Sequence, residues 1–407
     1  MRTEHARLNH VNWVRLVRGN PYERPESRTL ATLHGLNDEE REAYNDRRAD
    51  WHANFGVIKT PQLVRAHSQL GEIVAANQHV GDRVRGAAVV DAPPGLGKTT
   101  IANSYAFRYW AKEMRRGLPD DTRFDRIPVI KVGLKANVTT KWLTERMCKF
   151  MGLPTTGTET ALHDRLLDAT VGCETRLIVI DEIQFLNFAG KEGRKIHNHI
   201  KFLANELPAT FLFVGHSIRA TTARSNAAIQ DAARDQTDSR WTYVDVHPFQ
   251  VGTEEGRQAW RSFLLTVESK LVLASLKPGM LADGLADYVY ARTLGRMQHI
   301  TSLIVRGCVR AIDSGEEQLT RDLLDNIKLE KLVDDGRISR VAGADRGVYD
   351  LASHKPRNLP RTTPRAPRAT ANVAGGTTPA TKLTPPARPK PVRKSGPESK
   401  RPGSKAR

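Results

Sequence analysis

Cysteine is scarce in this chain of 407 residues, and long apolar runs are missing. The cysteines, Cys148, Cys173 and Cys308, are far apart and follow neither a zinc-ligand nor a disulfide spacing, so we expect buried, reduced thiols. No stretch approaches the roughly 18 apolar residues of a membrane span. Residues 1–20 have no apolar core of the kind that a signal peptide needs. The sequence therefore predicts a cytoplasmic protein that does not enter a membrane.

Acidic residues are too few to balance the basic ones, and the net charge is +18. Residues 352–407 hold fourteen lysines and arginines but one acidic residue, Glu398, so they contribute +13 of this total. They also hold eleven of the 22 prolines and almost no large apolar side chains. Because such a segment buries too little surface to offset its ordering entropy, we predict a disordered basic tail. The tail is expected to attract nucleic-acid phosphates, or else serves only to keep the protein soluble.

The most informative motif is Asp-Ala-Pro-Pro-Gly-Leu-Gly-Lys-Thr-Thr at residues 91–100. Residues 92–99 fit the phosphate-loop pattern, with alanine in place of the usual first glycine. An apolar run leads into the motif and a helix-compatible stretch leads out, which is the context that a phosphate loop requires. An ordinary turn before a helix is the alternative, but it has no need of Lys-Thr at this spacing. The motif therefore predicts a nucleotide-binding site.

Each part of this loop has a physical role in holding a nucleotide. Glycines let backbone N–H groups approach a phosphate closely, and the helix start adds free N–H donors. Lys98 is expected to reach the β- and γ-phosphates as a catalytic residue, and the Thr99 hydroxyl to ligate Mg²⁺. The predicted cofactor-binding residues of the loop are Ala92, Pro93, Pro94, Gly95, Leu96, Gly97, Lys98, Thr99 and Thr100.

A second motif consists of the apolar run 177–180 followed by Asp181 and Glu182. An unbroken apolar run is typical of a central parallel strand, and ligands of open α/β sheets bind at the carboxyl ends of the strands. We therefore predict Asp181 in the Mg²⁺ shell, directly or through water. Glu182 is the predicted catalytic residue that polarises the attacking water. With the phosphate loop, this motif predicts a Mg·ATP-binding protein and a hydrolase.

Apolar runs and helical patterns alternate through the middle of the chain, which predicts an α/β fold with a five-stranded parallel sheet. After residue 248 only helical periodicity remains, which predicts a small α-helical lid. The predicted strands are Ala87–Asp91, Ile127–Val132, Leu177–Asp181, Phe211–Gly215 and Thr242–Val246. The predicted domains are a helical N-terminal extension (1–55), an α/β nucleotide-binding core (56–248), the lid (249–335) and the disordered basic tail (336–407).

The N-terminal extension has its own helix signals. Asn37 precedes three acidic residues and is the expected N-cap of a helix. We expect one apolar stripe on this helix, formed by Leu36, Ala43 or Tyr44, Trp51 and Phe55, so the helix is expected to dock on another part of the protein.

The fourth apolar run ends in Gly215-His216-Ser217. Its place in the chain resembles the strand on which AAA+ ATPases carry the polar sensor 1 residue. The resemblance makes His216 and Ser217 catalytic candidates, although Asn or Thr is more usual there. A simple polar strand end is the alternative.

Residues 236–241, Gln-Thr-Asp-Ser-Arg-Trp, resemble the Gln-x-x-Ser-Arg-Phe stretch of AAA+ ATPases in the transposition-regulator group (TniB, TnsC and IstB-like proteins). In that group the arginine lies at the subunit boundary. The resemblance therefore implies that Arg240 acts as an arginine finger toward a neighbouring subunit. Arg234 is the competing candidate. Alternatively, Arg240 is an ordinary surface arginine that contacts only solvent.

The resemblance to TniB-like proteins extends over roughly residues 35–330. Residues 36–44 resemble their opening helix, 59–61 their entry to the core, and 306–317 their final helices. Residues 293–296, Thr-Leu-Gly-Arg, match sensor 2 only approximately and make Arg296 a further cofactor-binding candidate. His216 departs from the common threonine, and the basic tail lies outside the resemblance.

The resemblance implies a homo-oligomer that binds ATP and Mg²⁺ and forms rings or helical filaments on double-stranded DNA. Such proteins engage a DDE-type transposase, with a TniQ-like adaptor as a further partner. A helicase loader or replication initiator is one alternative, and a nucleotide-gated switch with little turnover is another. The core residues expected to face DNA, or else only solvent, are Lys135, Lys141, Lys191, Arg194, Lys195 and Lys201.

Overall fold

The computed structural model describes residues 9–17, 21–78, 85–117, 119–121, 123–136, 138–185, 191–219, 240–345 and 349. The chain divides into two compact units, Met1–Lys355 and Pro356–Arg407, and every described residue belongs to the first. Most of the basic tail therefore lies outside the described residues.

The core contains the predicted five-stranded parallel sheet, with the strand order β2-β3-β4-β1-β5. The strands are β1 (Ala87–Asp91), β2 (Val129–Gly133), β3 (Leu177–Asp181), β4 (Thr210–Gly215) and β5 (Trp241–Asp245). The bounds of β1 and β3 are those predicted, and the other three strands begin or end within two residues of the prediction. Parallel strands place all their carboxyl ends at one edge, so Asp91, Asp181 and Gly215 share that edge.

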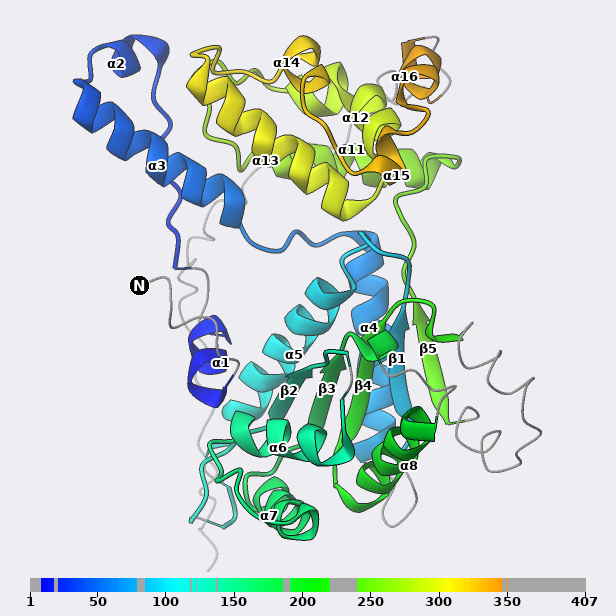
Figure 1. Cartoon of the computed structure of the whole chain (residues 1–407). Coiled ribbons are helices and arrows are strands. Elements are labelled where there is room, and N and C mark those ends of the chain that lie inside the picture. The colour runs from blue at the N-terminus through cyan, green and yellow to red at the C-terminus, as the bar shows by residue number, and fades with distance from the viewer. Residues whose placement is uncertain are drawn as a thin grey trace, which may run out of the picture. The chain divides into compact units, whose positions relative to one another are not determined.

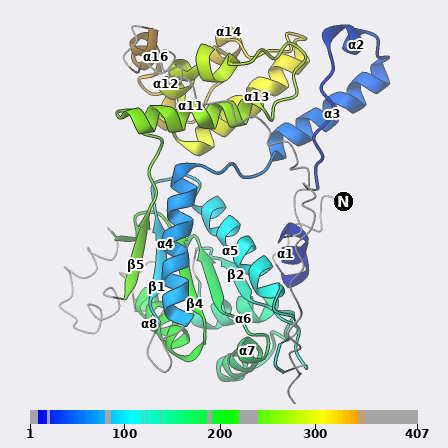
Figure 2. The same cartoon turned by 180° about the vertical axis from the view of Figure 1, so that it is seen from behind.

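Helices cover both faces of the sheet, as the long apolar strands require. Helices α4 and α5 pack on one face (Figure 2), and α6 and α8 lie on the other, where α7 packs against α6 (Figure 1). The apolar side of α8 is buried as predicted, through Ile196, Ile200, Leu203 and Leu207. The core helices and turn are α4 (Pro61–Gln78), α5 (Lys98–Met114), α6 (Thr140–Phe150), α7 (Glu159–Gly172), η2 (Ile183–Phe185) and α8 (Lys191–Glu206).

A second hydrophobic core begins at Phe249 and is built from helices, as the change of periodicity predicts. Trp260 and Phe263 stack on each other at its centre, with Phe249 against both rings. Arg292 is fully buried, and its guanidinium donates to the carbonyl oxygens of Leu324 and Ile327. The elements of this lid are α11 (Glu254–Glu268), η3 (Met280–Gly284, a π-helical turn), α12 (Ala286–Thr293), α13 (Met297–Asp313), α14 (Arg321–Asp325), α15 (Lys331–Asp334) and α16 (Arg337–Asp345).

Helix α16 lies within the range 336–407 that composition assigns to the tail. Val341 and Ala344 are buried in the lid core, so ordered structure continues past residue 335. The basic composition that predicted the tail becomes dominant only after this helix.

The N-terminal extension is helical, as predicted, and contains α1 (His10–Val17), α2 (Leu30–His34) and α3 (Asp38–Asn54). Trp13 of α1 packs in the α/β core against Phe107, Trp110 and Phe150. Helix α3 instead packs on α13 of the lid (Figure 1). Asn37 caps α3 in a capping box with Glu40, which confirms the predicted start.

The three cysteines are buried and unpaired. Among the described residues, no helix is both long and apolar enough to span a membrane.

Candidate nucleotide-binding site

The loop between β1 and α5 has the backbone that its glycines permit. Gly95 and Gly97 have φ angles of 84° and 82°, left-handed values that favour glycine over any other residue. Gly97 is the N-cap of α5 and Lys98 is the first residue of that helix. The free N–H groups of the first turn therefore face the loop, which makes an anion site.

Thr99 and Asp181 come together at the carboxyl edge of the sheet, as predicted. The Thr99 hydroxyl donates to Oδ1 of Asp181 at 3.3 Å, and the backbone N–H of Glu182 donates to the same oxygen at 3.0 Å. Nζ of Lys131 lies 3.4 Å from the other carboxylate oxygen, Oδ2. A hydroxyl and a carboxylate oxygen are the hard ligands that Mg²⁺ prefers, so this pair fits the metal.

Lys98 lies beside these groups. Its Nζ donates to the carbonyl oxygen of Pro93 at 3.1 Å, within its own loop. Burial lowers the pKa of the Lys98 ammonium, and the carboxylates of Glu182, Asp91 and Asp181 oppose that shift. An ammonium has three donors, so the bond to Pro93 leaves others for a phosphate.

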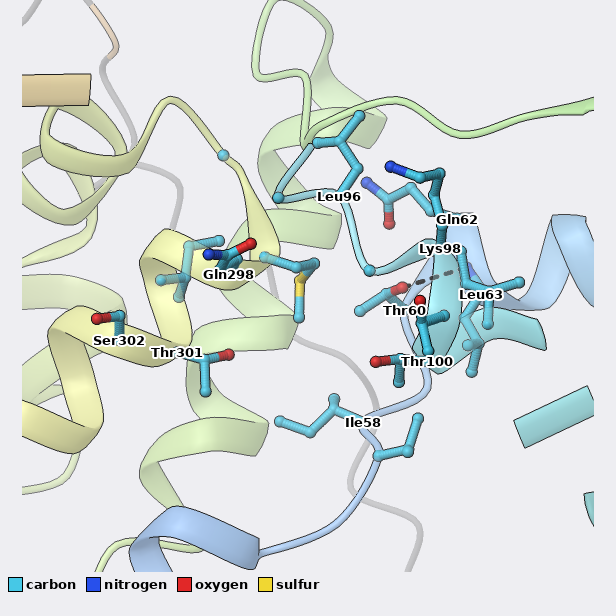
Figure 3. A pocket seen from close by; sticks show the side chains of 18 of the residues that line it. Ile58, Thr60, Gln62, Leu63, Leu96, Lys98, Thr100, Gln298, Thr301 and Ser302 are labelled. Atoms are coloured by element: carbon cyan, nitrogen blue, oxygen red, sulfur yellow. Dashed lines mark hydrogen bonds between the residues drawn. The ribbon is translucent and has the colours of Figure 1, made fainter. Parts of the chain in front are cut away.

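A cavity of about 1000 Å³ adjoins the loop. Figure 3 shows three of the segments that line it: the phosphate loop with Leu96 and Lys98, the segment from Ile58 to Leu63, and helix α13. Apolar side chains from the core entry and the lid line one part, and the loop, Glu182 and His216 line another. A planar base suits the apolar part and phosphates suit the loop, so the volume and lining both fit a nucleotide.

The two sensor 1 candidates differ in position. His216 lines the cavity, whereas Ser217 is not among its lining residues and places its hydroxyl 3.4 Å from Nδ1 of His216. Arg296 also lies outside the lining. Its Nη1 donates to the carbonyl oxygen of Pro94 at 3.0 Å, so it contacts the backbone of the phosphate loop.

Comparisons with known proteins bear on this arrangement. Residues 82–222, which include the phosphate loop, β3 and β4, match the family model described as AAA domain. This segment is an AAA domain. A comparison with curated proteins gave no match.

Solved structures show the same fold beyond the AAA domain itself. The ORC1 protein of Aeropyrum pernix in complex with DNA is 17% identical over 73% of this chain and 69% of that chain, with a TM-score of 0.50. The ORC2 protein of Aeropyrum pernix, in ADPNP-ADP complexes, is 14% identical over 76% of this chain and 86% of that chain, with a TM-score of 0.51. At these identities the likeness concerns the fold.

Arg240 is not among the residues that line the cavity. It directly precedes β5, and its carbonyl oxygen accepts the N–H of Ala87 at the start of β1. Because β1 and β5 are parallel, Arg240 is at the sheet edge opposite the phosphate loop. Its side chain is exposed. Arg234 and residues 236–239 lie outside the described residues.

Sequence reasoning missed three polar residues of the AAA domain and lid. Lys131 sits in an apolar strand, where a lone lysine is itself a signal, and donates to Asn103 as well as pairing with Asp181. Gln184 lies two residues after Glu182 and donates to its carboxylate. Arg306 of α13 lines the cavity from the lid. These contacts depend on tertiary structure, so spacing alone does not reveal them.

Proposed function

We propose that this chain binds Mg·ATP and hydrolyses it as a DNA-associated, oligomeric AAA+ ATPase that regulates DNA transposition. The observation that carries the proposal is the convergence of Lys98, Thr99, Asp181 and Glu182 at one edge of the sheet, beside a nucleotide-sized cavity. Their spacing in the sequence and their proximity in space lead to the same chemistry.

Each residue has a role in this reaction. Loop N–H groups and Lys98 bind the phosphates, and Thr99 and Asp181 hold Mg²⁺, which neutralises phosphate charge when bound. Glu182 polarises the attacking water. His216 reaches the γ-phosphate side of the cavity as sensor 1, with Ser217 as its neighbour. Arg296 supports the phosphate loop from the lid.

The position of Arg240 supports an oligomer. An arginine at the sheet edge opposite the phosphate loop serves ATP hydrolysis only in the next subunit's site. A ring or filament supplies such a neighbour to every site.

Two observations bear on the biological role. The segments that resemble TniB-like proteins, 36–44 and 306–317, belong to parts of the fold that Arg48 and Glu317 join through a buried ion pair. The resemblance itself, and not the ion pair, supports the transposition role, with a transposase and a TniQ-like adaptor as partners. The fold likeness to a DNA-bound ORC1 protein favours a replication initiator as the second candidate. Residues 319–344 pack into the lid core, so they complete the lid and do not form a separate DNA-binding domain.

DNA contact in the core is proposed near α6. Nζ of Lys135 and the guanidinium of Arg146 lie 5.5 Å and 4.9 Å from the centre of the Trp142 ring, and Lys141 is exposed beside them. Contacts from such cations to phosphates give affinity with little base reading. The side chains of Lys191 and Arg194 lie outside the described residues, and Lys195 and Lys201 have interaction partners in the fold.

Nucleotide binding and turnover, with and without duplex DNA, test the proposal. Lys98→Ala should abolish ATP binding in calorimetry, whereas Lys112→Ala, in the last turn of the same helix, should not. Glu182→Gln should keep ATP binding but lower kcat by about 10²- to 10⁴-fold and trap the assembled form on DNA. Full turnover in Glu182→Gln would refute the role of that residue. ATP-dependent capture of a transposase, and not of a replicative helicase, would separate the two biological roles.

A further inference from the structure

Gln184 connects the proposed catalytic acid to the end of the neighbouring strand. It lies in η2 and lines the cavity. Its amide Nε2 donates a hydrogen bond to Oε2 of Glu182. Its Oε1 accepts the backbone N–H of His216, the first residue after β4, at 3.3 Å. One side chain thus links the end of β3 to the end of β4.

The hydrogen-bond partners fix the orientation of this amide. A backbone N–H can only donate, so the amide oxygen must face His216. The NH₂ group then faces Glu182, whose ionised carboxylate only accepts. Both ends of the side chain are therefore satisfied in one orientation, and the reversed orientation would leave two mismatched contacts.

The backbone on both sides is shaped for this contact. Glu182 has a φ angle of 61°, a left-handed value that glutamate adopts rarely. A Cβ built on Gly215 would lie 2.5 Å from Oε1 of Gln184 and 2.9 Å from Cγ2 of Ile183. A larger residue at position 215 would therefore push Gln184 or Ile183 out of its place beside β4.

We propose that Gln184 is a positioning residue for ATP hydrolysis, an inference that rests on the proposed ATPase function. Its amide holds the exposed carboxylate of Glu182 in one place at the cavity, which reduces the freedom that an unrestrained glutamate side chain would have. Because the other end of the amide is bonded to His216, movement of that residue on nucleotide binding is transmitted to Glu182. In this role Gln184 acts through Glu182.

Substitutions at position 184 separate the two ends of the bridge. Gln184→Met keeps the length of the side chain but removes both hydrogen bonds. Gln184→Glu keeps the acceptor for His216 and replaces the donor with a second carboxylate beside Glu182. We expect either change to lower kcat by about tenfold to a hundredfold, with affinity for a fluorescent ATP analogue within about twofold of wild type. Gln78→Met is the matched control and should leave kcat unchanged. Gln78 is the last residue of α4, and its amide donates a hydrogen bond to the hydroxyl of Tyr109.

A double-mutant cycle distinguishes positioning from a general structural role. In single-turnover measurements, Gln184→Met should lower the rate of hydrolysis by less than about twofold when Glu182 is already glutamine, because there is then no carboxylate to position. A structural role would lower turnover by the same factor in both backgrounds. Gly215→Ala, which displaces Gln184 without altering any group of the bridge, should reproduce the kcat loss and its dependence on Glu182.

The outcomes separate this inference from the function on which it rests. A wild-type protein that does not hydrolyse ATP, alone or with DNA, overturns the proposed function. A wild-type protein that hydrolyses ATP, with Gln184→Met equally active or equally impaired in both backgrounds, overturns the positioning role alone.

Discussion

Substitution of Arg48 tests whether a buried ion pair binds the N-terminal extension to the lid. Arg48 of α3 donates to both carboxylate oxygens of Glu317, at 2.6 Å and 2.9 Å. The side chains are only 2% and 5% exposed. The same guanidinium also donates to the carbonyl oxygen of Val272 and to Oδ1 of Asn45. Two parallel hydrogen bonds join these charges in a buried, low-dielectric environment, where such a pair is stronger than it is at the surface.

The magnitude follows from what Arg48→Met would leave behind. Glu317 would stay buried, and among the described donors only the N–H of Ala274 would still reach its carboxylate. Removal of one partner of a buried pair costs about 3–5 kcal/mol, because the other charge is left uncompensated. Arg41→Met is the matched control on the same helix. Arg41 pairs with Asp38 at the exposed surface, and loss of such a pair costs less than about 1 kcal/mol.

Urea unfolding followed by tryptophan fluorescence measures both changes. Trp51 reports on this contact, since its indole N–H donates to the carbonyl oxygen of Lys270 in the lid at 2.7 Å. The double variant Arg48→Met/Glu317→Met should lose much less stability than the two single variants together, because no buried charge remains. If Arg48→Met is no more destabilising than Arg41→Met, the ion pair does not hold α3 on the lid.

Two further predictions concern pH and oligomerisation. Burial, assisted by Arg48 and Arg24, lowers the pKa of His52 to about 4 from 6.5, and its Nε2 accepts the N–H of Val272 as the neutral ring. As pH falls, the unfolded chain takes up this proton at a higher pH than the folded chain does. The contribution of His52 to the free energy of unfolding is therefore complete above pH 6.5 and falls by about 3 kcal/mol toward pH 4. His52→Gln should remove this loss, as measured by urea titrations. Arg240→Ala should spare ATP binding but lower turnover of the assembly by about 10³-fold or more. When this variant is mixed with a variant that cannot bind ATP, steady-state assays should show that the two complement each other in trans. Absence of complementation would contradict the role of Arg240 as an arginine finger.

The sheet and the phosphate loop were predictable from local sequence. Strand β3 is buried along its whole length, so its apolar run marks its bounds without ambiguity. The loop needs glycine at left-handed positions and a lysine at the helix start, and these requirements leave a motif in the sequence. Asp181 and Glu182 stand at the end of this apolar run, so the sequence predicts their place at the carboxyl edge of the sheet.

Residues that act through tertiary contacts could not be predicted. The proposed role of Gln184 depends on its contact with His216, which follows β4 and lies far from Gln184 in the sequence. The apolar stripe of α3 predicted docking, but an apolar face does not specify its partner. The structure places α1 on the α/β core and α3 on the lid, a division that no local pattern encodes. Helix α16 was missed because its basic, short sequence resembles the tail that follows it.

The path of the chain past the cavity has a mechanical consequence. Helix α3 packs on the lid and α4 packs on the sheet, and the residues between them, from Phe55 to Thr60, run along the cavity wall. The return connection, from Val246 to Phe249, also lines the cavity, through His247 and Phe249. A ligand that fills the cavity is therefore expected to contact both connections between the α/β core and the lid. Exchange of a bound triphosphate for a diphosphate would then act on both connections, and α3, which Arg48 joins to the lid, would move with the lid.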